Sequence, residues 1–191
     1  MSGRLTMICH AATSAVRAAH FPLDEALDSR AHTMACEMAP QLGRVDVAWT
    51  SPALRATQTA AALRLDAEVD PRLRDISLGR WAGHSLEEIA AAEPEAVRAW
   101  TSDPDAAPHG GESVTDLLSR IQPWLDAAAG DDRRVVAVTH ASVIRAAIIL
   151  AIDARPVSFW RIDIAPLCRV ELRMNAGHWR LRSIEAPVRR S

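Results

Sequence analysis

The chain has 191 residues, of which 49% are hydrophobic, enough to bury one substantial core and to favour a single domain over residues 1–191. Its formal net charge of −2 comes from 22 basic and 24 acidic residues spread along the sequence. That balance gives no sign of a nucleic-acid or membrane-surface partner. No apolar run reaches the length needed to span a membrane.

The number and spacing of the cysteines and histidines bear on the cellular compartment and on metal binding. The three cysteines, Cys9, Cys36 and Cys168, are widely spaced and odd in number, so they cannot form a complete disulfide framework. The first residues also lack the long apolar core and cleavage site of a signal peptide. We therefore expect a cytoplasmic protein. Five histidines have no metal-ligand spacing with the cysteines or with each other, so we expect no metal site: His20, His32, His84, His109 and His178.

Strand and helix patterns alternate along the chain. Short apolar runs over residues 5–9, 45–49 and 135–138 predict buried strands. Helical patterns cover residues 27–42 before Gly43, 54–63 after Ser51-Pro52, 114–129 between Ser113 and Gly130, and 141–152. Two late strands, 168–173 and 179–184, flank the turn signal Asn175-Ala176-Gly177 and favour a hairpin. Residues 101–111 predict a loop or lid, and residues 187–191 a frayed tail.

This alternation predicts a three-layer α/β/α sandwich with a mainly parallel central sheet. In such folds, ligands bind beyond the carboxyl ends of the strands. His10 and His140 each follow a predicted strand directly, so both should lie at that edge. A histidine in such a place is often only structural. Arg55, at the start of a predicted helix, adds a group suited to binding phosphate.

The motif around Arg55 is specific. Ser51-Pro52, Arg55-Ala56 and Gln58-Thr59-Ala60 resemble the "Ser-Pro-x-x-Arg-Ala-x-Gln-Thr-Ala" signature of the histidine phosphatase superfamily, relatives of phosphoglycerate mutase. Three further segments agree in order and spacing: Leu73-Arg74-Asp75-Ile76 with Gly79 and Trp81-Ala82-Gly83, then Gly111-Glu112-Ser113, then Val138-Thr139-His140 with Val143-Ile144-Arg145. The stretch from Leu73 to Gly83 is more similar to the small phosphatase branch, which includes alpha-ribazole and broad-specificity phosphatases, than to the glycolytic mutases.

The resemblance implies a phosphoglycerate mutase-like fold and a phosphohistidine mechanism without metal or organic cofactor. His10 takes the place of the nucleophile, Asp75 that of the proton donor, and His140 and Arg55 surround the phosphoryl oxygens. We expect substrate contacts also from four further residues: Thr13, Arg17, Glu112 and Ala141. Glu112 is an alternative proton donor if Asp75 is too short, although Gly111-Glu112-Ser113 also reads as a helix cap. Trp49 and Trp81 read as core aromatics.

The pocket departs from the family pattern at its first position. Members open with Arg-His-Gly, whereas this chain has Cys9-His10-Ala11. The absent Arg normally makes charge-assisted hydrogen bonds to phosphate, each worth roughly 1.5–3 kcal/mol, so two lost bonds would slow turnover about a hundredfold to ten-thousandfold. Arg17 or Arg145 could replace its charge. Cys9 itself is a weak candidate nucleophile, because the following residues lack the Arg spacing and the glycines of cysteine phosphatases.

The function predicted from the sequence is phosphomonoester hydrolysis through His10, on a small-molecule phosphorylated substrate, with neither nucleic acid nor membrane as partner. Two alternatives stay open. One is a degenerate pocket that binds an anion, a metabolite or a partner protein without turnover, because a fold does not guarantee its ancestral activity. The other is a relative diverted to a different reaction. The substrate and the oligomeric state, monomer or homodimer, are not readable from the sequence.

Overall fold

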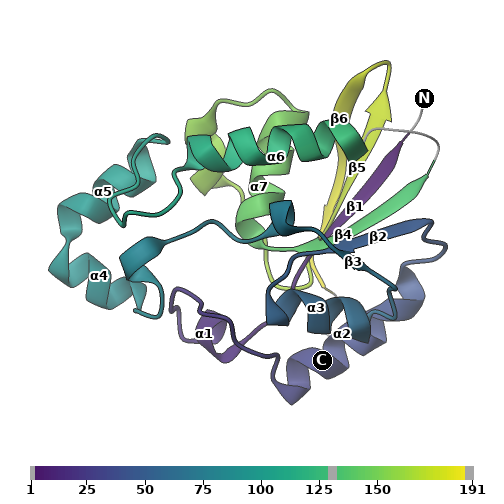
Figure 1. The fold of residues 1–191 in the computed structure, drawn as a ribbon, viewed down its shortest axis with the longest axis horizontal. Coiled ribbons are helices and arrows are strands. Elements are labelled where there is room, and N and C mark those ends of the chain that lie inside the picture. Colours follow the sequence, from purple (N-terminus) through teal and green to yellow (C-terminus); the bar gives the residue numbers. More distant parts are fainter. Residues whose placement is uncertain (1–2, 129–132, 188–191) are drawn as a thin grey trace.

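The computed structural model describes residues 3–128 and 133–187 (Figure 1). The chain order is β1 (Arg4–Cys9), α1 (Ser14–Arg17), α2 (Ser29–Met38), β2 (Val47–Thr50), α3 (Leu54–Ala62), β3 (Glu68–Val69), α4 (Leu86–Ala92), α5 (Pro94–Ser102), α6 (Val114–Ala128), β4 (Arg134–Thr139), α7 (Ala141–Ala151), β5 (Arg169–Asn175) and β6 (His178–Glu185). Single 3₁₀ segments cover Ala39–Gln41, Pro71–Leu73, Gly79–Trp81 and Pro156–Arg161. Within these ranges, no helix has the length and apolarity to cross a membrane.

The strands form one six-stranded sheet in the order β3-β2-β4-β1-β5-β6. Strands β3, β2, β4 and β1 run parallel to one another, while β5 is antiparallel to both of its neighbours, β1 and β6. The hairpin expected around Asn175-Ala176-Gly177 joins β5 to β6. The mainly parallel sheet predicted from the sequence is confirmed, with an antiparallel pair on one side.

Successive side chains of β1 point to opposite faces of the sheet, and a different layer of helices covers each face. Leu5, Met7 and Cys9 point into a large core with α6 and α7, whereas Ile8 packs with α3 on the opposite face. Figure 1 shows α6 and α7 on one side of the sheet and α2 and α3 on the other. Because β1 and β4 lie at the centre and are covered on both faces, they are nearly continuous apolar runs.

Two helical expectations needed revision. The pattern over residues 27–42 is shorter in the structure, because α2 begins after its cap Asp28 and a 3₁₀ segment containing Pro40 replaces its end. Proline lacks the N–H that would continue the helix. The short helices α4 and α5 were not predicted, although Ser85 and Glu88 form a capping box at the start of α4. Gly130 and the tail beyond residue 187 lie outside the described residues.

The segment predicted as a lid is fastened to the rest of the protein. Residues 103–111 follow α5, and their end packs closely against residues 77–80, where Glu112 N donates to Ser77 O (2.8 Å) and Arg80 N donates to His109 O (3.0 Å). A Cβ on Gly111 would overlap the Ser77 carbonyl, so glycine is required for this approach. Aromatic contacts from Trp81 to Trp100, with ring centroids 5.5 Å apart, hold α5 against the same region.

Candidate active site

Three adjacent parallel strands end at one edge of the sheet and place three polar side chains side by side. His10 follows β1, Ser51 follows β2 and His140 follows β4. The ladder continues one step past the strand ends, because His10 N donates to Thr139 O (2.8 Å) and Ser51 N donates to Val138 O (2.9 Å). The imidazole centroids of His10 and His140 are 5.1 Å apart. The edge predicted from the sequence therefore brings the two histidines together.

His10 is held as a neutral ring. Its Nδ1 lies 2.8 Å from Ala11 O, and since a carbonyl oxygen only accepts, Nδ1 carries the ring proton. The lone pair of Nε2 then accepts from Arg55 Nε at 3.2 Å. Burial, followed by the electrostatic interaction with the neighbouring His140, lowers the pKa of His10 to about 3. At neutral pH the ring therefore presents an unprotonated Nε2 toward Arg55.

Arg55 is the centre of the cluster, and only 4% of its side chain is exposed. Its Nη2 donates to Asp75 Oδ2 (3.0 Å) and lies 3.3 Å from His140 Nδ1. Its Nη1 donates to Leu23 O (2.8 Å), and the Glu25 carboxylate lies 3.6 Å away. In the free protein each of the three guanidinium nitrogens therefore donates one hydrogen bond, to His10, to Leu23 O or to Asp75.

The loop before α2 and the start of α3 explain why Arg55 points inward. Helix α3 has no side-chain cap of its own, and Leu54 N donates instead to Asp24 Oδ1 (2.7 Å). Thr59, one turn further along, is buried, accepts from Ala11 N (3.0 Å) and donates to Arg55 O. Thr59 of the motif therefore connects α3 to the residue after His10.

Asp75 lies opposite the histidines. Its Oδ1 accepts from Ile76 N (2.9 Å) and from the Ser142 hydroxyl, and its Oδ2 is 3.3 Å from His140 Nδ1. Burial alone would raise the pKa of Asp75, but the charges and hydrogen bonds of His140, Arg55 and Ser142 outweigh it and hold that pKa far below its usual range. In the free protein Asp75 is therefore a carboxylate.

Two hydroxyls in the cluster were not predicted as functional residues. The Ser51 hydroxyl lies 2.7 Å from His140 Nε2, and the Ser142 hydroxyl donates to Asp75. Both are buried and orient ionisable groups. Ser51 stands in the Ser-Pro motif and Ser142 follows His140 by two positions, so the motifs themselves were the available signal.

A pocket of about 210 Å³ opens onto this cluster, with Arg55 and Asp75 in its wall. The other lining residues are Pro22, Ile76, Ser77, Leu78, Gly79 and Ala82. The two ionic groups therefore lie beside four apolar residues, one serine and one glycine.

The remaining predicted substrate contacts have other partners in the structure. Arg17 forms an exposed ion pair with Asp28 (2.7 Å), and Glu112 is held by Arg120 in a bidentate pair with both N···O distances at 2.7 Å. Thr13 is buried and caps α1 through Val16 N. Ala141 begins α7 directly after His140. Ala141 is thus the chain neighbour of a member of the cluster, while Arg17 and Glu112 are paired with residues outside it.

Cys9 stands at the position of the motif Arg, and the guanidinium of Arg145 contacts Ile162 and Phe159. Cys9 is 2% exposed and packs in the same core as Leu5 and Met7. Burial, with the charge of Asp75 adding to it, raises the pKa of Cys9 above its ordinary value, so the thiol stays protonated. Arg145 donates through Nε to Ile162 O (2.7 Å), and its guanidinium carbon lies 5.6 Å from the centroid of Phe159. Cys9 is thus a small buried residue rather than a thiolate.

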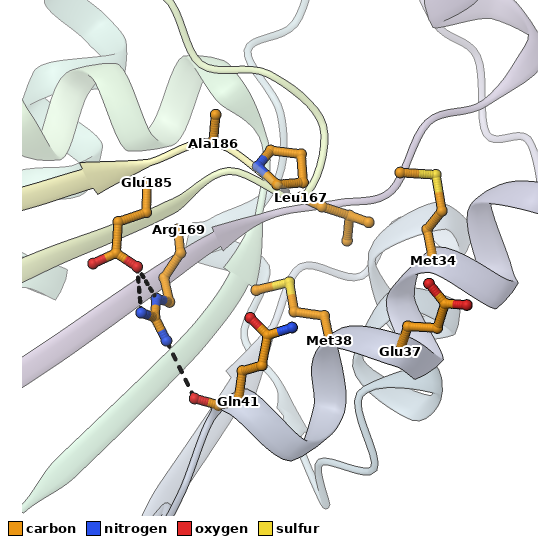
Figure 2. Close-up of a pocket in the computed structure, with 9 residues that line it drawn as sticks. Met34, Glu37, Met38, Gln41, Leu167, Arg169, Glu185 and Ala186 are labelled. Carbon is orange, nitrogen blue, oxygen red and sulfur yellow. Dashed lines mark hydrogen bonds and ion pairs between the residues drawn. The ribbon is translucent and has the colours of Figure 1, made fainter. Parts of the chain in front are cut away.

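A second hollow, of about 410 Å³, lies between α2 and the ends of β5 and β6 (Figure 2). It shares no lining residue with the pocket beside Asp75. Its arginine, Arg169, donates to Glu185 and to Gln41 O (3.3 Å), and Met34 and Met38 supply apolar surface. Over the parts of the chain that are described, neither hollow contains three or more side chains arranged to hold a metal ion.

The comparisons with known proteins agree with the geometry. A glucosyl-3-phosphoglycerate phosphatase from Mycobacterium tuberculosis (strain H37Rv) is 34% identical over 173 residues, which are 82% of this chain and 77% of that one. The corresponding enzyme of Mycolicibacterium vanbaalenii is 40% identical over 121 residues, 56% of this chain and 53% of that relative. The solved structure of a mycobacterial glucosyl-3-phosphoglycerate phosphatase matches with a TM-score of 0.84 at 30% identity, covering 95% of this chain and 97% of that one.

A family model for the histidine phosphatase superfamily (branch 1) matches residues 5–187, nearly the whole chain. The phosphoserine phosphatase 1 of Hydrogenobacter thermophilus is a further relative, 29% identical over 147 residues, which cover 72% of this chain and 70% of that one. The motifs, the sheet edge and these matches lead to one conclusion. The chain belongs to the histidine phosphatase superfamily.

Proposed function

We propose that the protein hydrolyses phosphate monoesters through a phosphohistidine formed on His10. Phosphomonoester hydrolysis is the activity that the family and the named relatives support. The observation that carries the assignment of His10 is its ring, buried at the strand end with the proton on Nδ1 and the Nε2 lone pair facing Arg55. A neutral imidazole with a fixed lone pair is the form in which histidine acts as a nucleophile.

Substrate binding has to displace contacts that the free protein makes. The Arg55 guanidinium donates to His10 Nε2 and to Asp75, so a phosphoryl group gains its hydrogen bonds only when those two partners release it. Release frees the Nε2 lone pair for attack. It also removes one hydrogen-bond donor from Asp75 and brings a new negative charge beside it, so the pKa of Asp75 rises and the carboxyl can take up a proton.

The two chemical steps then balance on these residues. In the first, His10 Nε2 forms a bond to phosphorus, the bond from phosphorus to the ester oxygen breaks, and that oxygen takes the proton of Asp75. In the second, water attacks phosphorus and gives its proton to the Asp75 carboxylate while the bond to Nε2 breaks. Arg55 and His140 stabilise the charge on the phosphoryl oxygens throughout. Asp75 serves as proton donor in the first step and as proton acceptor in the second, so these two steps need no metal or organic cofactor.

The loss of the motif Arg supports a slower enzyme or one confined to binding. Arg55 is the single arginine among the described residues that line the pocket. Because its charge is shared with Asp75 and Glu25, a phosphate dianion enters a site with less positive charge than two arginines would supply. The alternative of anion binding without turnover therefore rests on a specific feature, the buried Cys9.

Trapping the covalent intermediate tests the proposal. We expect wild-type protein mixed with a radiolabelled phosphomonoester and quenched in alkali to carry acid-labile phosphate, which His10→Ala abolishes. His178→Ala, an exposed histidine at the start of β6, serves as the matched control and should label as the wild type does. Labelling that persists in His10→Ala would refute the assignment. Binding of inorganic phosphate without label or turnover would favour the binding alternative.

The expected compartment remains the cytoplasm, because all three cysteines are free.

A further inference from the structure

Four of the six residues that line the pocket besides Arg55 and Asp75 are apolar. They are Pro22, Ile76, Leu78 and Ala82, and the other two are Ser77 and Gly79. Leu23, next to Pro22, is 62% exposed, and its carbonyl holds Arg55. An exposed leucine next to a pocket-lining proline extends the apolar surface outward, so a leaving group that leaves the phosphate site meets apolar side chains first.

Three arginines close in sequence to the pocket are paired with carboxylates. Arg74 pairs with Glu112 (3.4 Å), Arg80 pairs with Glu93 and donates to Pro108 O, and Arg17 pairs with Asp28 (2.7 Å). These three arginines lie close in sequence to pocket-lining or cluster residues, and each is directed at a carboxylate. Arg55 is therefore the one arginine that the pocket offers within the described ranges, and the phosphoryl group requires it.

The carboxylate of Glu25 acts against a second negative charge near Arg55. Its Oε2 lies 3.6 Å from Nη1 of Arg55, so it already shares the charge of that guanidinium. A carboxylate on the leaving group would find no cation of its own and would be repelled by Glu25, because like charges repel. An apolar leaving group meets neither penalty and buries its surface against Ile76 and Leu78.

We infer that the substrate of this site is a phosphomonoester whose leaving group is small, apolar and uncharged, rather than one that carries a carboxylate. The inference rests on the proposed function for the phosphate site and adds the class of leaving group. It separates this chain from relatives whose names specify phosphoglycerate or phosphoserine, both of which bear carboxylates. The pocket volume of about 210 Å³ favours a small leaving group.

Hydrolysis of matched esters tests the inference. Benzyl phosphate, 3-phosphoglycerate and O-phosphoserine all release a primary or secondary alcohol, so their intrinsic reactivities are comparable, and glycerol 3-phosphate supplies an uncharged polar leaving group. We expect kcat/KM for benzyl phosphate to exceed that for either carboxylate ester by at least tenfold. Equal or higher kcat/KM for a carboxylate ester would overturn the inference while leaving the proposed hydrolysis intact.

Binding measurements keep the two proposals distinguishable. Titration calorimetry with benzylphosphonate and 3-phosphonopropionate reports the preference without turnover, and we expect the former to bind at least tenfold more tightly. If no ester is hydrolysed but this preference holds, the proposed hydrolysis fails and the inference on ligand class stands. If the phosphonopropionate binds as tightly, or neither ligand binds, the inference is overturned.

A variant at the pocket wall supplies the converse test. Ala82 lines the pocket and is half-buried, so Ala82→Arg places a cation there. We expect kcat/KM for 3-phosphoglycerate relative to that for benzyl phosphate to rise at least tenfold. Ala82→Gln adds comparable length without charge and should leave that ratio within about threefold of the wild type. A ratio that changes equally in both variants would show that size rather than charge governs the choice, against the inference.

Discussion

Asp75 should limit how tightly the free site binds phosphate, because it holds the guanidinium of Arg55 that phosphate requires. Asp75→Asn removes the negative charge and keeps the size of the side chain. Two like unit charges about 4 Å apart repel by about 4 kcal/mol at an effective dielectric constant of about 20. Asp75 is 27% exposed on its side chain, and solvent weakens that repulsion. We therefore expect affinity for inorganic phosphate to rise roughly tenfold to a hundredfold, which is about 1.4–2.8 kcal/mol.

Calorimetric titration of phosphate into wild type and Asp75→Asn at pH 7.5 measures this difference. Asp66→Asn, at an exposed position outside the pocket, is the matched control. The ratio of the two affinities should narrow toward pH 5.5, because protonation of Asp75 accompanies phosphate binding in the wild type alone. Turnover should fall about a hundredfold or more in the same variant, since the proton donor is lost. A folded Asp75→Asn protein that binds phosphate no more tightly than the wild type would refute the reasoning.

Three further predictions concern His10 and the cysteines. The pKa of His10 lies near 3 in the folded protein and about 6.5 unfolded, so the unfolded state binds the proton first and stability falls as the pH drops below about 6.5. We expect the free energy of unfolding, measured with urea, to fall by about 2 kcal/mol between pH 7 and pH 5, and His10→Asn should remove this pH dependence. An equal loss in both proteins would contradict the assignment of the low pKa to His10. Cys9→Arg should raise kcat about a hundredfold or more if the added guanidinium reaches the phosphate. The same variant should lose about 1–3 kcal/mol of folding stability, because the larger side chain overfills the core. Unchanged kcat in a folded variant would count against the role given to the motif Arg. Iodoacetamide should modify exposed Cys36 in the native protein and reach buried Cys9 and Cys168 only after unfolding, as intact mass before and after urea would show.

The fold was largely predictable because its central strands are buried on both faces. Continuous apolar runs around residues 5–9 and 135–138 fix β1 and β4, and each is followed at once by a histidine. Helices α4 and α5 escaped prediction because they are short, with 7 and 9 residues, and bury few side chains: Ile89 in one and Trp100 in the other. Their positions depend on tertiary contacts among aromatic residues that are distant in sequence.

The residues at the centre of the site were predictable because they follow the buried central strands. The partners of the charged residues around them were not predictable. Strand ends in register place His10 and His140 together, and the helix after Ser51-Pro52 brings Arg55 to them. Which partner each outer charged side chain takes is set by where whole helices lie. Glu112 therefore pairs with Arg120 from α6, and Arg17 pairs with Asp28, the cap of α2. Spacing along the chain reveals neither pair.

The two outer strands of the sheet have a consequence for behaviour at high concentration. Unpaired backbone groups on an edge strand can recruit a strand from another molecule and begin aggregation. One edge here, β3, is only 2 residues long, and the other, β6, carries the exposed Arg180 and Arg182. A short strand offers little to pair with, and like charges keep two β6 edges apart. Replacing both arginines with valine would turn that edge into a surface on which copies of the chain could associate.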